Sequence, residues 1–158
     1  MKKQFMVLSM FVLLGGLVFS GGQSEISGDD ALDDLLALEL GTYEPYYGDS
    51  DPTEYAALFA DEATYFDPWV DAYHEDAAIT ESLMAWKGRI PNLEYELLNP
   101  RVDLYGDTAV LVFNLECSDP ESGQTVVLWR GTTVFTRAGG SWEKVHAHWS
   151  TTPPPPEG

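Results

Sequence analysis

Residues 130–150 read RGTTVFTRAGGSWEKVHAHWS, and their pattern carries the strongest hairpin signal in the chain. Polar and apolar side chains alternate on both sides of Gly139 and Gly140, which is the period of a β-strand. A pair of glycines between two such runs is typical of a hairpin turn. The stretch therefore predicts two long antiparallel strands joined by a tight turn.

The rest of the chain has helical spacing in its first part and strand spacing from residue 92 onward. Leucines at helical intervals predict an amphipathic helix within 29–47, Pro52 begins a shorter helix, and a third helix is predicted over 75–86. The strands are predicted over 63–67, 93–98, 101–105, 108–117, 125–137 and 142–151. Helices gathered before adjacent strands indicate an α+β domain in which a bent, mainly antiparallel sheet wraps around three N-terminal helices.

The first 22 residues have the pattern of a secretory signal peptide, with Lys2 and Lys3 before an apolar run. The run is shorter than the roughly 20 residues that a membrane-spanning helix needs, so we expect cleavage and no membrane attachment afterwards. The mature domain is then predicted over 23–152, followed by a disordered, proline-rich tail over 153–158. We expect a periplasmic or secreted protein.

The charge of the chain argues against two kinds of partner. Eight basic residues against 26 acidic ones give a formal net charge of −18, which repels nucleic acid and anionic lipid surfaces. Cys117 is the single cysteine, so it forms no disulfide within the chain. It falls in step with apolar residues of one strand, and we expect it to be buried and inert.

Two segments carry a family resemblance. Residues 51–68, DPTEYAALFADEATYFDP, together with residues 130–150, resemble the SnoaL-like branch of the nuclear-transport-factor-two-like superfamily. Its relatives include ketosteroid isomerases, polyketide cyclases and the association domain of calcium/calmodulin-dependent kinase. The resemblance implies a cone-shaped α+β barrel, in which three helices close a strongly curved sheet around a central pocket, commonly in homodimers.

A ligand site is predicted from polar residues that interrupt apolar strand faces. Asn114 and Arg130 each stand alone among apolar neighbours, and an arginine in such a place requires an anion or a carboxylate. If the last strand is regular, Lys144 and Ser150 share one side with His146 and His148. We expect that side to line the cone.

The predicted site binds a small, partly apolar organic molecule. Arg130 would anchor an anionic group, and Asn114, His146 and His148 would orient the ligand. An aromatic wall is predicted from four further residues, namely Tyr55, Tyr65, Trp69 and Trp86. Each polar residue also has a structural alternative, since Arg130 could pair with Asp67 and His148 could bond to the backbone.

Whether the protein is an enzyme stays open at this point. Asp67 as base and His148 as acid would suit proton transfer in an isomerase, cyclase or dehydratase. The pair His146 and His148 would suit a transition metal, but the sequence offers no evident third ligand, so no metal and no cofactor is expected. The alternative is a non-catalytic oligomerisation module, whose contact surface would use apolar residues of the outer sheet face: Trp129, Phe135, Val145 and Trp149.

Overall fold

The computed structural model describes residues 27–152. Its helical elements are α1 (Gly28–Tyr43), the π-helical segment η1 (Glu44–Gly48), α2 (Thr53–Ala56) and α3 (Ala77–Met84). The strands are β1 (Phe59–Phe66), β2 (His74–Glu75), β3 (Glu94–Tyr105), β4 (Thr108–Ser118), β5 (Thr125–Ala138) and β6 (Ser141–Thr151). The predicted signal peptide and proline-rich tail lie outside the described residues.

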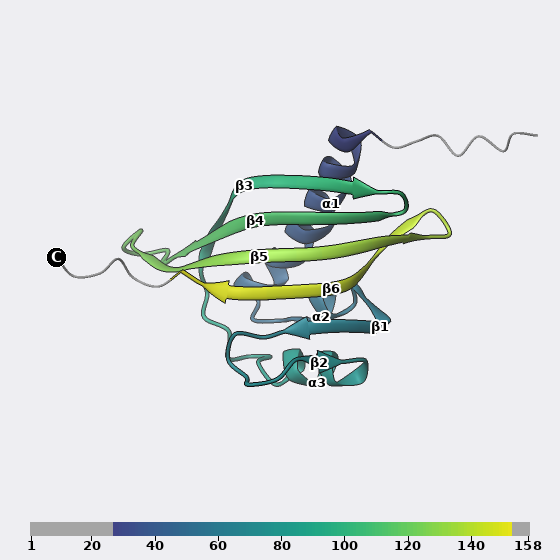
Figure 1. Ribbon diagram of the computed structural model, residues 1–158. Helices are drawn as coiled ribbons and strands as arrows, with labels where there is room; N and C mark the ends of the chain where they lie inside the picture. The colour runs from purple at the N-terminus through teal and green to yellow at the C-terminus, as the bar shows by residue number, and fades with distance from the viewer. Residues whose placement is uncertain (1–26, 153–158) are drawn as a thin grey trace, which may run out of the picture.

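The strands form one curved sheet in the order β2-β1-β6-β5-β4-β3. Every neighbouring pair is antiparallel except β1 and β6, which run parallel. Helix α1 crosses behind the long strands, and α2 and α3 lie behind and below β6 and β1 (Figure 1). The predicted α+β class, with a curved mixed sheet around N-terminal helices, is confirmed.

Helix α1 begins where the acidic segment predicts it. Ser27 is the N-cap, and its hydroxyl oxygen accepts a hydrogen bond from the Asp30 backbone N–H at 3.1 Å. Asp29 and Asp30 add negative charge at the positive end of the helix dipole. The predicted segment 29–47 thus becomes α1 together with η1.

Strands β2 and β3 differ from the sequence predictions. The two strands predicted over 93–98 and 101–105 are one strand, β3, with a register shift between Leu98 and Arg101. Asn99 has a positive φ of 53° at this irregularity, and the following Pro100 has no N–H to donate. The short strand β2 was not predicted, because two residues are too few to show a period.

A β-bulge in β6 decides which side chains face the helices. Val134 pairs with His146 but Phe135 pairs with Lys144, so Val145 is an extra residue in the register. Lys144, Ala147 and Trp149 are therefore buried inside, whereas His148 is exposed. The prediction that side chains alternate regularly between the two faces of this strand is wrong, because the alternation is interrupted at Val145.

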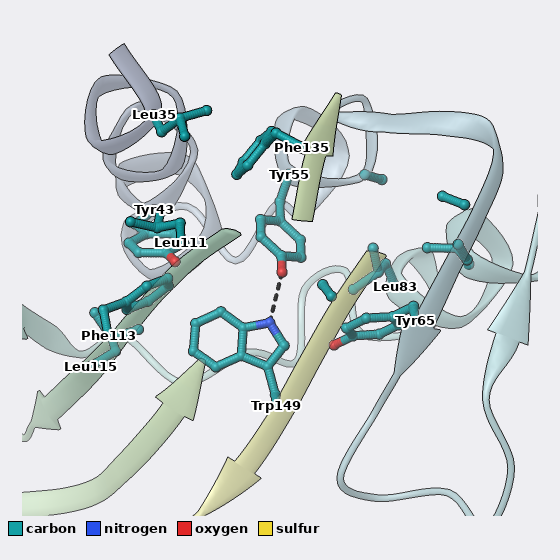
Figure 2. Close-up of a cluster of buried hydrophobic side chains, with 14 of the residues drawn as sticks. Leu35, Tyr43, Tyr55, Tyr65, Leu83, Leu111, Phe113, Leu115, Phe135 and Trp149 are labelled. Carbon is teal, nitrogen blue, oxygen red and sulfur yellow. Dashed lines mark hydrogen bonds between the residues drawn. The ribbon is translucent and has the colours of Figure 1, made fainter. Parts of the chain in front are cut away.

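The core fills the concave side of the sheet. Figure 2 shows aromatic and aliphatic side chains of α1, β4, β5 and β6 around Tyr55, whose hydroxyl accepts a hydrogen bond from Trp149 Nε1 at 2.8 Å. Gly131 leaves room for two rings, since a Cβ there would lie 2.9 Å from Phe113 and 3.2 Å from Trp149. Cys117 is buried, as predicted. Among the described residues, no helix is long and apolar enough to cross a membrane.

Candidate functional site

A cavity of about 420 Å³ lies between the helices and the concave face of the sheet. Most of its wall is aromatic. Five tyrosines contribute to it: Tyr43, Tyr46, Tyr47, Tyr55 and Tyr65. Four tryptophans contribute as well: Trp69, Trp86, Trp129 and Trp149. This volume is in the range of ordinary small-molecule sites.

Asp67 is the one charged residue of the cavity wall in the part of the chain that the structure describes. It directly follows β1, and only 7% of its surface is exposed. Its Oδ1 accepts a hydrogen bond from the Trp69 backbone N–H at 2.9 Å. The carboxylate is thus held in place by the turn that follows the strand.

The tyrosines around Asp67 are neutral phenols at physiological pH. Burial, followed by the negative charge of Asp67, raises the pKa of Tyr46 from 10.0 to about 12. Burial, then Tyr46 and Asp67, raise the pKa of Tyr65 as well. A neutral phenol keeps its proton and can donate it in a hydrogen bond to a ligand.

Three of the four cavity tryptophans form a continuous wall through edge-to-face contacts. The Trp129 ring lies 5.9 Å from Trp69 and 6.3 Å from Trp149, and Phe113 contacts Trp149 at 5.4 Å between ring centroids. These geometries are the favourable ones for aromatic pairs. These contacts join Trp69, Trp129 and Trp149 into one aromatic surface.

The mouth of the cavity exposes large apolar side chains. Trp69 is 65% exposed, Trp86 is 40% exposed and Val126 is 57% exposed, although all three also line the cavity. Side chains that are partly exposed beside a hollow are available for contact with an entering molecule.

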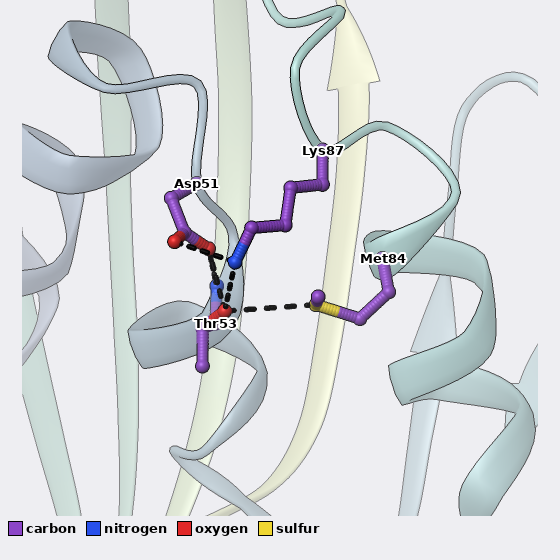
Figure 3. Close-up of polar contacts among 4 residues, drawn as sticks. All are labelled: Asp51, Thr53, Met84 and Lys87. Carbon is purple, nitrogen blue, oxygen red and sulfur yellow. Dashed lines mark hydrogen bonds and ion pairs between the residues drawn. The ribbon is translucent and has the colours of Figure 1, made fainter.

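A polar link holds the α3 side of the mouth. Lys87 Nζ forms an ion pair with Asp51 Oδ2 at 2.7 Å and donates to Thr53 Oγ1 at 3.2 Å, while the Thr53 hydroxyl also contacts the Met84 sulfur (Figure 3). The hydrogen bond with Lys87 is the main reason that the pKa of Asp51 is lowered to about 2. The link fixes the segment that carries Trp86.

A buried ion pair lies behind the aromatic wall. Lys144 Nζ is 2.9 Å from Glu39 Oε1, and both side chains are fully buried. The Tyr43 hydroxyl donates to Glu39 Oε2 at 3.2 Å, and the ammonium group lies 4.1 Å from the Tyr55 ring centroid. Burial lowers the pKa of Lys144, and Glu39 opposes that change. Neither residue was predicted as a partner of the other.

The prediction that Arg130 and Asn114 line the cone is wrong. They face each other across β4 and β5, on the outer face of the sheet. The Arg130 guanidinium is exposed and donates to the Thr151 carbonyl at 2.9 Å, and Asn114 donates to the Trp129 carbonyl at 3.2 Å. Their alternating partners, Leu115 and Trp129, are the residues that point inward.

His146 and His148 also lie on the outer face. His146 Nδ1 is 2.7 Å from the Thr64 hydroxyl, and the His148 ring lies 5.2 Å from Phe66. Burial, followed by the charge of His148, lowers the pKa of His146. Residues 27–152 contain no group of three side chains that could hold a metal ion around this pair.

The predicted pairing of Asp67 with His148 fails for the same reason. Phe66 is the register partner of His148 on parallel strands, and both are exposed on the outer face. Asp67 is the next residue, so its side chain points to the opposite side, into the cavity. The two groups are separated by the sheet.

Five predicted site residues do line the cavity. They are Asp67, Tyr55, Tyr65, Trp69 and Trp86, while their functional roles remain predictions. Sequence reasoning missed Trp129 and Trp149, which it placed on the outer face together with the buried Phe135. It also missed Tyr43, Tyr46 and Tyr47, although three tyrosines in five residues were a visible signal.

The fold and the cavity define a cone-shaped α+β domain of the nuclear-transport-factor-two-like class. The sequence profile described as SnoaL-like domain matches residues 43–154, which is most of the chain. The chain therefore belongs to the SnoaL-like domain family, as the resemblance implied. Comparison with curated protein sequences gives no significant match.

Three solved structures share the fold. A protein of unknown function with a cystatin-like fold from Nostoc punctiforme has a TM-score of 0.68 at 16% identity, covering 84% of this chain and 98% of the other. The association domain of Caenorhabditis elegans CaMKII has a TM-score of 0.64 at 21% identity, with coverages of 78% and 98%. A candidate ketosteroid isomerase from Parabacteroides distasonis has a TM-score of 0.58 at 24% identity, with coverages of 73% and 86%.

Proposed function

We propose that the cavity binds a small, partly apolar organic molecule in an exported protein. The observation that carries this proposal is the aromatic wall of the cavity, in which Asp67 is the one fixed carboxylate among the described residues. Pockets of this kind bury most of a ligand's surface against apolar groups and orient it with a few polar ones. No anion anchor is part of the proposal, because Arg130 lies outside the cavity.

A cavity-filling variant tests the proposal. Val127 lines the cavity, so Val127→Trp should fill it and abolish ligand retention, measured by native mass spectrometry of protein purified from its own host. Val134 is on the outer face of the same strand, and Val134→Trp is the matched control that should retain the ligand. Equal retention by both variants would contradict the proposal.

Proton transfer is an extension of the same site. Asp67 is buried beside the neutral phenols of Tyr46 and Tyr65, which is the environment in which a carboxylate can act as base and a phenol can stabilise developing negative charge. If the bound molecule is turned over, Asp67→Asn should lower kcat by at least about two orders of magnitude. An unchanged kcat would exclude Asp67 as the base.

An association module is the second candidate function. It is favoured by the shared fold with the CaMKII association domain, which covers 78% of this chain. A homodimer is compatible with ligand binding, whereas a larger empty ring would favour association as the main role. The same native mass spectra report the subunit number, and the mass of the exported chain tests signal-peptide cleavage.

A further inference from the structure

We propose that the ligand is an organic cation, whose ammonium group is held by Asp67 and by the faces of the surrounding aromatic rings. This inference rests on the proposed function and deepens it by naming the chemical class of the ligand. It is opposite in sign to the anionic group that the sequence suggested for Arg130.

The charges of the cavity wall favour a cation. Asp67 is its only charged side chain among the described residues, and no lysine, arginine or histidine joins it there. The ion pairs found between residues 27 and 152 join Lys87 to Asp51, Arg101 to Asp103 and Lys144 to Glu39. None of them includes Asp67, so no residue in this described range pairs with the carboxylate as a counter-charge.

The position of Asp67 makes that missing counter-charge significant. A carboxylate with 7% exposure has lost most of its hydration, and its one hydrogen bond in the described structure comes from the Trp69 N–H. Burying a charge is costly unless a partner compensates it. An ammonium group in the cavity would be that partner, whereas an anionic ligand would be repelled.

The aromatic wall supplies the second interaction. The face of an aromatic ring carries partial negative charge and attracts cations, most strongly for tryptophan. The protein already uses this interaction twice near the cavity. The Lys144 ammonium lies 4.1 Å from the Tyr55 ring centroid, and the Arg89 guanidinium lies 5.6 Å from the Trp86 ring centroid.

The net charge of the chain also favours a cationic ligand. A formal net charge of −18 raises the local concentration of cations and lowers that of anions around the mouth. The exposed part of that mouth is apolar, through Trp69 and Val126. An apolar body with a cationic group therefore matches both the entrance and the interior.

Two probes of the same shape separate charge from apolar contact. Phenyltrimethylammonium and tert-butylbenzene differ by the replacement of a cationic nitrogen with a carbon atom, and benzenesulfonate serves as the anionic probe. Intrinsic fluorescence reports binding directly, since four tryptophans line the cavity. We expect the cation to bind at least about ten-fold more tightly than tert-butylbenzene, and benzenesulfonate more weakly than either.

Single substitutions test which residues cause the preference for the cationic probe. Asp67→Asn keeps an oxygen that accepts the hydrogen bond from the Trp69 N–H. We expect this variant to bind the cation at least about ten-fold more weakly, and to bind tert-butylbenzene with nearly unchanged affinity. Asp61 is exposed on β1, the strand that Asp67 directly follows, so Asp61→Asn is the control for the loss of one negative charge. Trp69→Leu, at the exposed rim, should also weaken the cation more than the neutral probe.

The outcomes separate this inference from the proposed function. If tert-butylbenzene binds as tightly as the cation, or Asp67→Asn weakens both probes equally, the cation preference is wrong and the cavity remains a binding site. If Asp61→Asn has the same effect as Asp67→Asn, general attraction explains the result and the inference fails. If no probe changes the fluorescence, both the proposed function and the inference fail.

Discussion

Lys144 and Glu39 form the most costly polar contact in the core, since both are fully buried and 2.9 Å apart. Removing one partner would leave the other charge unpaired in an apolar environment. We expect Lys144→Met to lower the free energy of unfolding by about 3–5 kcal/mol, measured by urea denaturation. The double variant Glu39→Leu with Lys144→Met should regain most of this loss.

A surface pair provides the control for that experiment. Arg101 and Asp103 are 2.8 Å apart but exposed, so Arg101→Met should leave the free energy of unfolding nearly unchanged. If Lys144→Met is no more destabilising than Arg101→Met, the buried pair is not important for stability.

At Gly131, the addition of a single methyl group should affect the stability of the fold. A Cβ there would lie 2.9 Å from the Phe113 ring, which packs against Trp149 and cannot move freely. We expect Gly131→Ala to lower the free energy of unfolding by about 1–3 kcal/mol. Gly41 in α1 has open space around it, so Gly41→Ala should raise stability by about 0.5–1 kcal/mol. Thermal unfolding of both variants checks the prediction, and equal behaviour would contradict it.

At the level of helices and strands, the hairpin of β5 and β6 could be predicted because alternation and Gly139-Gly140 are local features. Which face of each strand the helices cover could not be predicted from the sequence. Val110 and Val112 make the outer face of β4 nearly as apolar as the inner face with Leu111, so the pattern does not tell which side the helices cover. The bulge at Val145 depends on pairing with neighbouring strands, and its effect on Lys144 and His146 has no local signal.

The link between α2 and α3 gives a prediction about the mouth. Lys87, which follows α3, pairs with Asp51, which precedes α2, and Gly88 N–H donates to the Ser50 carbonyl at 2.8 Å. Asp51→Asn should weaken this link and increase amide hydrogen exchange in residues 85–91, with little change in β4. A uniform increase over the whole domain would instead indicate global destabilisation.

Considered as a complete domain, the protein should unfold in alkali. The pKa of Tyr46 rises from 10.0 to about 12 on folding, and burial raises the pKa of Tyr43, Tyr47, Tyr55 and Tyr65 as well. The unfolded chain loses these protons first, so their stabilising contribution is complete below pH 10 and is lost as the pH rises toward 12. For Tyr46 alone the loss corresponds to about 3 kcal/mol.

Ultraviolet absorbance of tyrosinate measures that prediction. We expect the cavity tyrosines to ionise together with the loss of circular dichroism. Ionisation of all tyrosines before unfolding would show that the cavity does not protect them.

The indole N–H resonances of the five tryptophans report directly whether a cation enters the cavity, because four of these residues line the cavity and Trp142 does not. Trp142 lies near the other end of β6 from Trp149, with the Arg137 guanidinium 5.5 Å from its ring centroid. On titration with phenyltrimethylammonium, we expect the signals of Trp69, Trp86, Trp129 and Trp149 to shift while Trp142 stays in place. Shifts of the His146 and His148 rings, with the four cavity tryptophans unchanged, would place the ligand on the outer face of the sheet and contradict this prediction.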